Sequence, residues 1–128
     1  IATFWFEFQP SEGYHGASLI IGRKISVRPD IVFIKGEIEY YLRSQALLDK
    51  IYDKNIIIEC KEEEYNEWSN KISKQISDYR ELYKPKYLIV VSFKDSPKIK
   101  DADETFSNLR PDNKEEIERF KNYIRDIL

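Results

Sequence analysis

The sequence predicts an α/β fold in which helices flank a central mixed β-sheet. Apolar runs of strand length occur at residues 30–35, 55–61 and 86–93. Residues 64–83 instead carry apolar groups at steps of three and four, which is typical of a helix with one buried face. The same spacing follows Asp112. Because strands are followed by helices, we expect helices packed on the faces of one sheet.

Length and composition indicate one globular domain over residues 1–128. With 41% hydrophobic and 34% charged residues, the chain has enough apolar material for a core and is not of the disordered class. No apolar run approaches the length of a membrane span, so we expect no membrane association. The chain has neither a signal-peptide pattern nor a methionine. We therefore expect a domain excised from a longer protein that carries an attached domain.

The cysteine count and the net charge restrict the expected cellular location and the expected binding partners. A single cysteine, Cys60, forms no internal disulfide, which favours a reducing, cytoplasmic location. The net charge of −2 argues against a protein held to nucleic acid by bulk positive charge. It leaves room for a local basic rim around a binding site.

The first half of the chain predicts strands and one helical insertion. Residues 1–8 are aromatic and apolar, and they fit either a strand or the end of a helix. Residues 10–16 have turn composition. Residues 17–27 and 30–35 predict two successive strands, and residues 38–54 carry the apolar groups of a helical insertion.

The second half predicts a buried sheet centre between two helices. The helix over 64–83 has one apolar face, made of Trp68, Ile72, Ile76, Tyr79 and Tyr83. Lys84-Pro85 ends this helix. Residues 86–93 are typical of a strand buried at a sheet centre, and a polar loop is expected over 94–111.

The C-terminal segment predicts a capped amphipathic helix. Asp112 is expected at its start, with Glu115 three residues on as a capping box. The inner stripe of this helix consists of Ile117, Phe120, Ile124 and Ile127.

Two predicted strands carry carboxylates where apolar side chains would serve a core better. Glu59 and Lys61 are two residues apart and project to the same face, while Cys60 turns to the other face. Asp30 heads another strand and converges on Glu59 if the two strands are neighbours. Two close carboxylates repel unless a cation lies between them. Carboxylate oxygens suit Mg²⁺ or Mn²⁺, and a neighbouring lysine suits phosphodiester hydrolysis by a metal-activated water.

Three motifs in this order carry a family resemblance. They are Pro29-Asp30 before a strand, Glu59-Cys60-Lys61 at a strand end, and the QxxxY pattern of Gln75 and Tyr79 on the next helix. Residues 17–93, which contain them, resemble the PD-(D/E)XK nuclease superfamily. The similarity is to the subset related to RecB and lambda exonuclease, and to archaeal members of it. The resemblance implies a restriction-endonuclease-like fold with a central mixed sheet flanked by helices.

The resemblance also implies a role for each matching residue. Asp30 and Glu59 would ligate Mg²⁺ or Mn²⁺, together with the backbone carbonyl of Cys60. Lys61 would serve the attacking water, and Gln75 would support the site.

Four further residues are candidates with weaker signals. Tyr79 would support the site and also pack in the core. In many family members a further glutamate from the first helix joins the metal site, and Glu7 and Glu12 are both candidates for it. His15 lies in a loop flanked by Gly13 and Gly16, where it could contact a phosphate or the water, although a lone loop histidine is more often a surface residue.

These residues also allow purely structural interpretations. Asp30 could be a turn residue after proline, and Glu59 and Lys61 an exposed ion pair at a strand end. Cys60 fits buried packing better than a nucleophile. Pro111-Asp112 repeats the PD pair without a following apolar strand, and it indicates a helix start.

The function predicted from these motifs is a magnesium-dependent nuclease acting on DNA. Cleavage within a strand or from its end is left open, and RNA is an open alternative substrate. A catalytically degenerate module of the same fold, which binds nucleic acid or protein, is the second interpretation. A structural domain in a larger assembly is the third, and a homodimer remains open.

Overall fold

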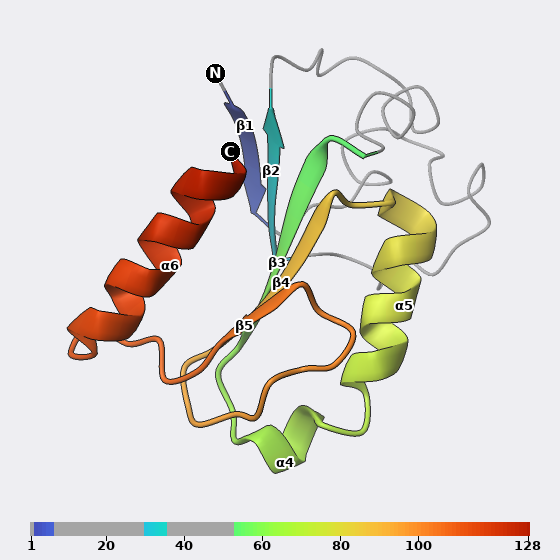
Figure 1. Ribbon diagram of the computed structural model, residues 1–128. Helices are drawn as coiled ribbons and strands as arrows, with labels where there is room; N and C mark the ends of the chain where they lie inside the picture. Colours follow the sequence, from blue (N-terminus) through green and yellow to red (C-terminus); the bar gives the residue numbers. More distant parts are fainter. Residues whose placement is uncertain (1, 7–29, 36–52) are drawn as a thin grey trace.

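The chain folds as a mixed β-sheet between helices (Figure 1). The computed structural model describes residues 2–6, 30–35 and 53–128. Within these ranges the sheet has five strands in the order β1-β2-β3-β4-β5. Helix α6 lies on one side of the sheet and helix α5 on the other (Figure 1). The predicted mixed α/β architecture is confirmed for this part of the chain.

The first two strands form the antiparallel half of the sheet. Strand β1, Ala2–Phe6, pairs antiparallel with β2, Ile31–Lys35. Residues 2–6 of the aromatic N-terminal run therefore form a strand and not a helix end. The predicted strand over 17–27 lies outside the described residues, as does most of the predicted helical insertion.

The end of that insertion is described, and there the prediction is wrong. Asp53 and Lys54 form a turn before β3. The φ angle of Asp53 is 59°, in the left-handed region, which a right-handed helix excludes. Aspartate tolerates this conformation better than most residues.

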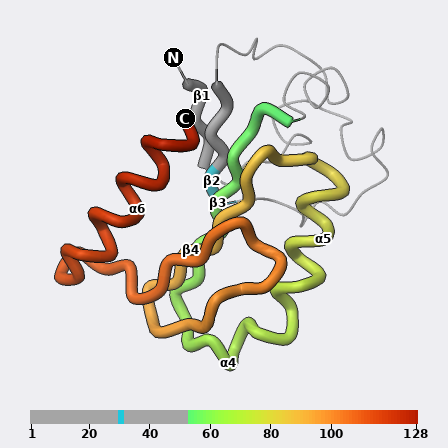
Figure 2. The backbone as a smooth tube through the Cα atoms, in the orientation of Figure 1, coloured from blue at the N-terminus to red at the C-terminus, as the bar shows by residue number. Residues whose placement is uncertain are grey.

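The centre of the sheet is a parallel pair of buried strands. Strand β3, Asn55–Lys61, pairs antiparallel with β2 and parallel with β4, Tyr87–Ser92. Leu88, Ile89 and Val90 of β4 are each 0% exposed, as predicted for a strand covered on both faces. A parallel pair needs a crossover connection, and helices α4 and α5 supply it (Figure 2).

The prediction of one continuous helix over 64–83 is wrong in one respect, because the structure has two helices in this segment. Helix α4 covers Tyr65–Trp68 and helix α5 covers Ile72–Tyr83. Between them the amide of Lys71 bonds the carbonyl of Trp68 at 3.1 Å, a turn-like contact. Ser69 and Asn70 stand at the break, and such residues favour turns over helix interiors. The predicted apolar face is nevertheless buried on both pieces, at Trp68, Ile72, Ile76, Tyr79 and Tyr83.

Helix α5 ends where the sequence predicts. Its C-cap, Lys84, has φ 44° and ψ 58°, the left-handed conformation that terminates many helices. Pro85 follows and has no amide hydrogen with which to continue the helix.

The predicted loop over 94–111 contains a strand that the sequence pattern did not reveal. Strand β5, Glu104–Phe106, is only three residues long and pairs parallel with β4. Thr105 and Phe106 are buried in it. Three residues are too few to show an alternation of apolar and polar groups.

Helix α6, Lys114–Ile127, begins one residue later than the capping box predicts. Asn113 is the N-cap, and its side-chain oxygen accepts from the amide of Glu116 at 3.3 Å. The predicted pair of Asp112 and Glu115 is therefore displaced by one position. Asparagine and aspartate are about equally good N-caps, so the sequence alone could not separate them.

The face of the sheet beneath α6 holds one apolar cluster. Its buried members are Ile56, Ile58, Ile89, Val91 and Phe106. Cys60 packs against it from β3, and Phe120, Tyr123, Ile124 and Ile127 pack against it from α6. Three of the four residues of the predicted inner stripe are therefore found here. Within the described residues, no helix is long and apolar enough to cross a membrane.

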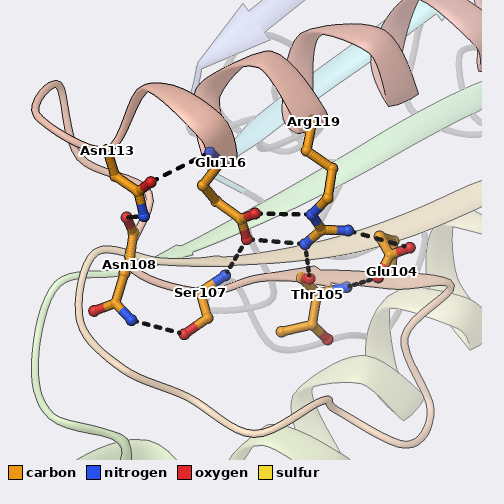
Figure 3. A network of polar contacts seen from close by, with 7 residues as sticks. All are labelled: Glu104, Thr105, Ser107, Asn108, Asn113, Glu116 and Arg119. Atoms are coloured by element: carbon orange, nitrogen blue, oxygen red, sulfur yellow. Dashed lines mark hydrogen bonds and ion pairs between the residues drawn. The ribbon is translucent and has the colours of Figure 1, made fainter.

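Arg119 links α6 to β5 through a hydrogen bond and an ion pair (Figure 3). Its Nη2 donates to the carbonyl of Thr105 at 2.9 Å, and its guanidinium lies 4.2 Å from the ring centroid of Phe106. Glu116 binds the same guanidinium and accepts from the amide of Ser107 at 3.0 Å. These contacts lower the pKa of Glu116, chiefly through the hydrogen bond from Arg119.

Candidate functional site

The first two predicted site residues lie together at adjacent strand ends. Ile31 pairs with Ile58 in the antiparallel register of β2 and β3. Continuing this register by one residue places Asp30 opposite Glu59. The Oδ2 atom of Asp30 accepts a hydrogen bond of 2.7 Å from the backbone amide of Cys60. The register and this bond hold the Asp30 carboxylate beside the last residues of β3.

Glu59 is a buried carboxylate with three polar partners. Its side chain comes from the α5 face of β3 and the residue is 4% exposed. The Tyr79 hydroxyl donates to Oε1 at 2.6 Å, the Gln75 amide donates to Oε2 at 3.1 Å, and the Lys61 ammonium lies 3.1 Å from Oε2. Burial of a charge without such partners would be strongly unfavourable.

Burial dominates the electrostatics of this carboxylate. Desolvation raises the pKa of Glu59 above its ordinary value, and the nearby charge of Asp30 raises it further. The hydrogen bond from Tyr79 and the charge of Lys61 both act in the opposite direction. Burial likewise raises the pKa of the Tyr79 hydroxyl, with the negative charge of Glu59 as the next cause. Tyr79 therefore remains a hydrogen-bond donor.

Gln75 connects the lysine to the carboxylate. Its Oε1 accepts from the Lys61 ammonium at 2.8 Å, while its Nε2 donates to Glu59 and to the Tyr79 hydroxyl at 3.2 Å. Because Gln75 and Tyr79 are four residues apart on α5, both side chains reach the same strand end. Helix α5 thus places two polar groups, the Gln75 amide and the Tyr79 hydroxyl, against the end of β3.

Cys60 contributes its backbone and not its thiol. The side chain packs toward α6, on the face opposite Glu59. Burial, followed by the charges of Asp30 and Glu59, raises the pKa of this thiol to about 12, so it is not an activated nucleophile. In a strand the N–H and C=O of one residue point to the same side. Since the amide of Cys60 points to Asp30, its carbonyl also points toward that side.

The oxygen atoms at this strand end fit a hard divalent cation. The donors are the carboxylates of Asp30 and Glu59 and the carbonyl of Cys60, with no sulfur or imidazole among them. Three hydrogen bonds or ion pairs reach Glu59, and a carboxylate has about four lone-pair positions. As far as contacts among the described residues go, one position therefore remains for a ligand bond.

No cluster of metal-binding side chains is found in the part of the chain that the structure describes. There, no three or more His, Cys, Asp or Glu side chains gather in a way that could hold an ion. The predicted additional candidates Glu7, Glu12 and His15 lie outside the described residues.

Trp68 is a site neighbour that sequence reasoning assigned only to the core. Its ring lies 5.9 Å from Lys61 Nζ, measured to the ring centroid. Trp68 and Lys61 are seven residues apart and belong to different elements. No sequence pattern signals this contact, because it depends on how the chain turns between β3 and α4.

No protein-family model, curated protein or solved structure matches this chain significantly. Any functional inference therefore rests on the geometry of these residues and on the motifs in the sequence.

Proposed function

We propose that this chain is a metal-dependent nuclease domain of the PD-(D/E)XK superfamily with a restriction-endonuclease-like fold. It would hydrolyse phosphodiester bonds of DNA. The observation that carries the proposal is the convergence of three sequence-distant segments on one strand end. Asp30 immediately precedes β2, Glu59 and Lys61 come from the end of β3, and Gln75 comes from α5.

The arrangement is more specific than a surface ion pair. Glu59 and Lys61 have side-chain exposures of 6% and 16%, so both charged groups are largely withdrawn from water. Burying two charges is costly, and an apolar pair of similar size would often be more stable at such a place. A chemical use for these side chains explains their presence better than stability does.

A divalent cation would be held by Asp30, Glu59 and the carbonyl of Cys60. When bound, such an ion supplies Lewis acidity toward phosphate and a water of lowered pKa. Asp30 and Glu59 provide the negative charge that attracts it. The hydrogen bond from Tyr79 lowers the pKa of Glu59 against the larger rise that burial causes, and so favours the ionised carboxylate.

Lys61 would act on the water and on the charge at phosphorus. Its ammonium has three N–H donors, of which Gln75 and Glu59 occupy two. The third is left to orient a nucleophilic water or to donate to a phosphate oxygen. Positioned donors of this kind act most strongly where water is excluded. Gln75 fixes the lysine relative to the carboxylate.

One observation favours the alternative of a degenerate module of the same fold. Lys61 and Glu59 already satisfy each other within a hydrogen-bonded network that includes Gln75 and Tyr79. A closed network can persist as a structural element after activity is lost. Such a module would bind nucleic acid or protein without cleaving it.

The test is an assay of nucleic-acid cleavage by the 128-residue chain. The substrates are supercoiled plasmid, linear duplex DNA, single-stranded DNA and RNA, each incubated with Mg²⁺, with Mn²⁺ and with EDTA. Asp30→Ala and Lys61→Met should each lose most activity, the first with weakened metal binding and the second with metal binding retained. The matched controls are Asp126→Ala on α6 and Lys74→Met on the exposed side of α5.

Each result has a defined meaning. Metal-dependent cleavage that Asp30→Ala leaves undiminished would contradict the nuclease proposal. Binding of nucleic acid without cleavage, under any metal condition, would favour the degenerate module. Calorimetry with Mn²⁺ on the same variants separates loss of the ion from loss of chemistry.

A further inference from the structure

Three described side chains contact the Lys61 ammonium, and two of these contacts are hydrogen bonds or ion pairs. Gln75 Oε1 lies 2.8 Å from Nζ, and Glu59 Oε2 lies 3.1 Å from it. The third contact is the ring of Trp68, at 5.9 Å from Nζ to the centroid. This distance is within the range over which a cation is attracted to an indole ring.

A ring can hold an ammonium in a way that a further acceptor could not. A third carboxylate or carbonyl would occupy the last N–H of the lysine. The face of an aromatic ring attracts the positive charge as a whole and does not require an N–H to point at it. Trp68 therefore restrains the flexible lysine and leaves one donor for water or phosphate.

Trp68 is itself fixed in place from two directions. Its Nε1 donates to the carbonyl of Glu63 at 3.2 Å, which ties the ring to the loop after β3. The ring of Tyr65 meets it edge to face, with centroids 4.9 Å apart. Trp68 is 5% exposed, so its ring is held in the packed interior and not on the surface. The break after α4 frees Trp68 from the helical register of α5.

We propose that Trp68 is a positioning residue that holds the Lys61 ammonium, through its ring face, in the orientation used for phosphodiester hydrolysis. The inference rests on the proposed nuclease function for its kinetic consequence. Its structural part, the placement of the ammonium by the ring, stands independently of any activity.

The first test observes the contact directly by NMR. The Hε protons of Lys61 should be shifted upfield in the wild-type protein by the ring current of Trp68. The shift should vanish in Trp68→Leu and persist in part in Trp68→Phe. The control Tyr123→Leu removes an aromatic ring from the other face of the sheet and should leave the Lys61 resonances in place. An unchanged Lys61 shift in Trp68→Leu overturns the proposal.

The second test is a double-mutant cycle on cleavage. Trp68→Leu should lower kcat about tenfold with little change in KM, and Trp68→Phe should retain most of the rate. In a Lys61→Met background, Trp68→Leu should change the residual rate less than about twofold, because the lysine through which it acts is gone. Equal losses in both backgrounds would show a structural role and overturn the proposal.

The two tests also separate this inference from the proposed function. If the wild-type chain cleaves no nucleic acid, the nuclease proposal fails, and the NMR comparison still decides whether Trp68 positions Lys61. If Trp68→Leu does not fold, Trp68→Phe carries both measurements. A Trp68→Phe protein that is folded, but in which Lys61 has no ring-current shift and cleavage is as fast as in wild type, overturns the inference.

Discussion

Removing the Tyr79 hydroxyl tests whether the buried carboxylate network is arranged as described. Tyr79→Phe deletes one oxygen and keeps the ring, which is 1% exposed and packs beside Tyr83 with centroids 6.3 Å apart. Among the hydrogen bonds that the described residues donate to Glu59, the one from this hydroxyl is the shortest, 2.6 Å to Oε1. The substitution therefore removes this hydrogen bond and the longer one that the hydroxyl accepts from Gln75 Nε2 at 3.2 Å, and it changes little of the packing.

The expected loss at neutral pH follows from the charge and burial of the acceptor. A hydrogen bond to a charged group contributes about 1.5–3 kcal/mol, and Glu59 is 4% exposed, so water does not easily replace the lost donor. We expect a decrease of about 2 kcal/mol in the free energy of unfolding at pH 7. For a domain of this size the corresponding fall in Tm is about 7 °C.

The loss should depend on pH in a defined direction. Burial raises the pKa of Glu59 above 4.5, whereas the Tyr79 hydrogen bond lowers it. Because the pKa of Glu59 is higher in the folded than in the unfolded state, the free energy of unfolding decreases as the pH rises from 4.5 through the folded pKa. Removing the hydroxyl raises the folded pKa further and enlarges this loss. Near pH 4, below both the ordinary value of 4.5 and the raised folded value, Glu59 is mostly protonated in both states. The hydrogen bond to Glu59 is then one to a neutral group, worth about 1 kcal/mol.

The assay is urea unfolding of both proteins in EDTA at pH 7 and at about pH 4. Tyr123→Phe serves as the control, because Tyr123 is half-buried beside Phe106 on the other face of the sheet. The control should change stability by less than about 0.5 kcal/mol. A Tyr79→Phe effect as small as that of the control, or equal at both pH values, would refute this account of the Glu59 site.

Three further predictions concern other parts of the molecule. Without metal, the Tm of Asp30→Asn should equal or exceed that of the wild type, because the substitution removes the charge that repels Glu59. Mn²⁺ at ten times Kd should add about 1.4 kcal/mol to the free energy of unfolding of the wild type only. Equal stabilisation of both proteins by Mn²⁺ would contradict the metal site. The Cys60 thiol, with a pKa near 12, should react with a disulfide reagent at pH 8 much more slowly in the folded chain than in urea, and equal rates would refute its burial. Arg119→Met should cost about 1–2 kcal/mol in urea unfolding and speed hydrogen exchange in α6; a change below about 0.5 kcal/mol would show that its contacts do not fasten that helix.

Local signals in the sequence were sufficient for most of the described elements. The apolar runs at 55–61 and 86–93 correspond to β3 and β4, since buried parallel strands need apolar side chains on both faces. The periodic apolar face over 64–83 is buried as predicted, because that spacing places its members on one side of a helix. The start of α6 differs from the prediction by one residue, where Asp112 and Asn113 are both good caps.

Local signals failed where the structure depends on partners distant in the sequence. Strand β5 is only three residues long and exists because β4 offers it a parallel edge. The break between α4 and α5 allows Trp68 to contact the end of β3, a requirement that no periodicity expresses. Glu104 and Arg119, which join β5 to α6, had no sequence motif to mark them.

In the candidate site, too, some features follow from the local sequence and others depend on tertiary packing. Strand alternation alone indicates that Glu59 and Lys61 share a face and that Cys60 turns away, because successive residues of a strand point to opposite sides. Only the antiparallel pairing of β2 with β3 brings Asp30, 29 residues earlier in the chain, beside Glu59. Only the packing of α5 against the sheet turns Gln75 and Tyr79 into partners of that carboxylate. Hydrogen bonds act over about 3 Å, so partners far apart in sequence meet only when tertiary packing has fixed their backbones.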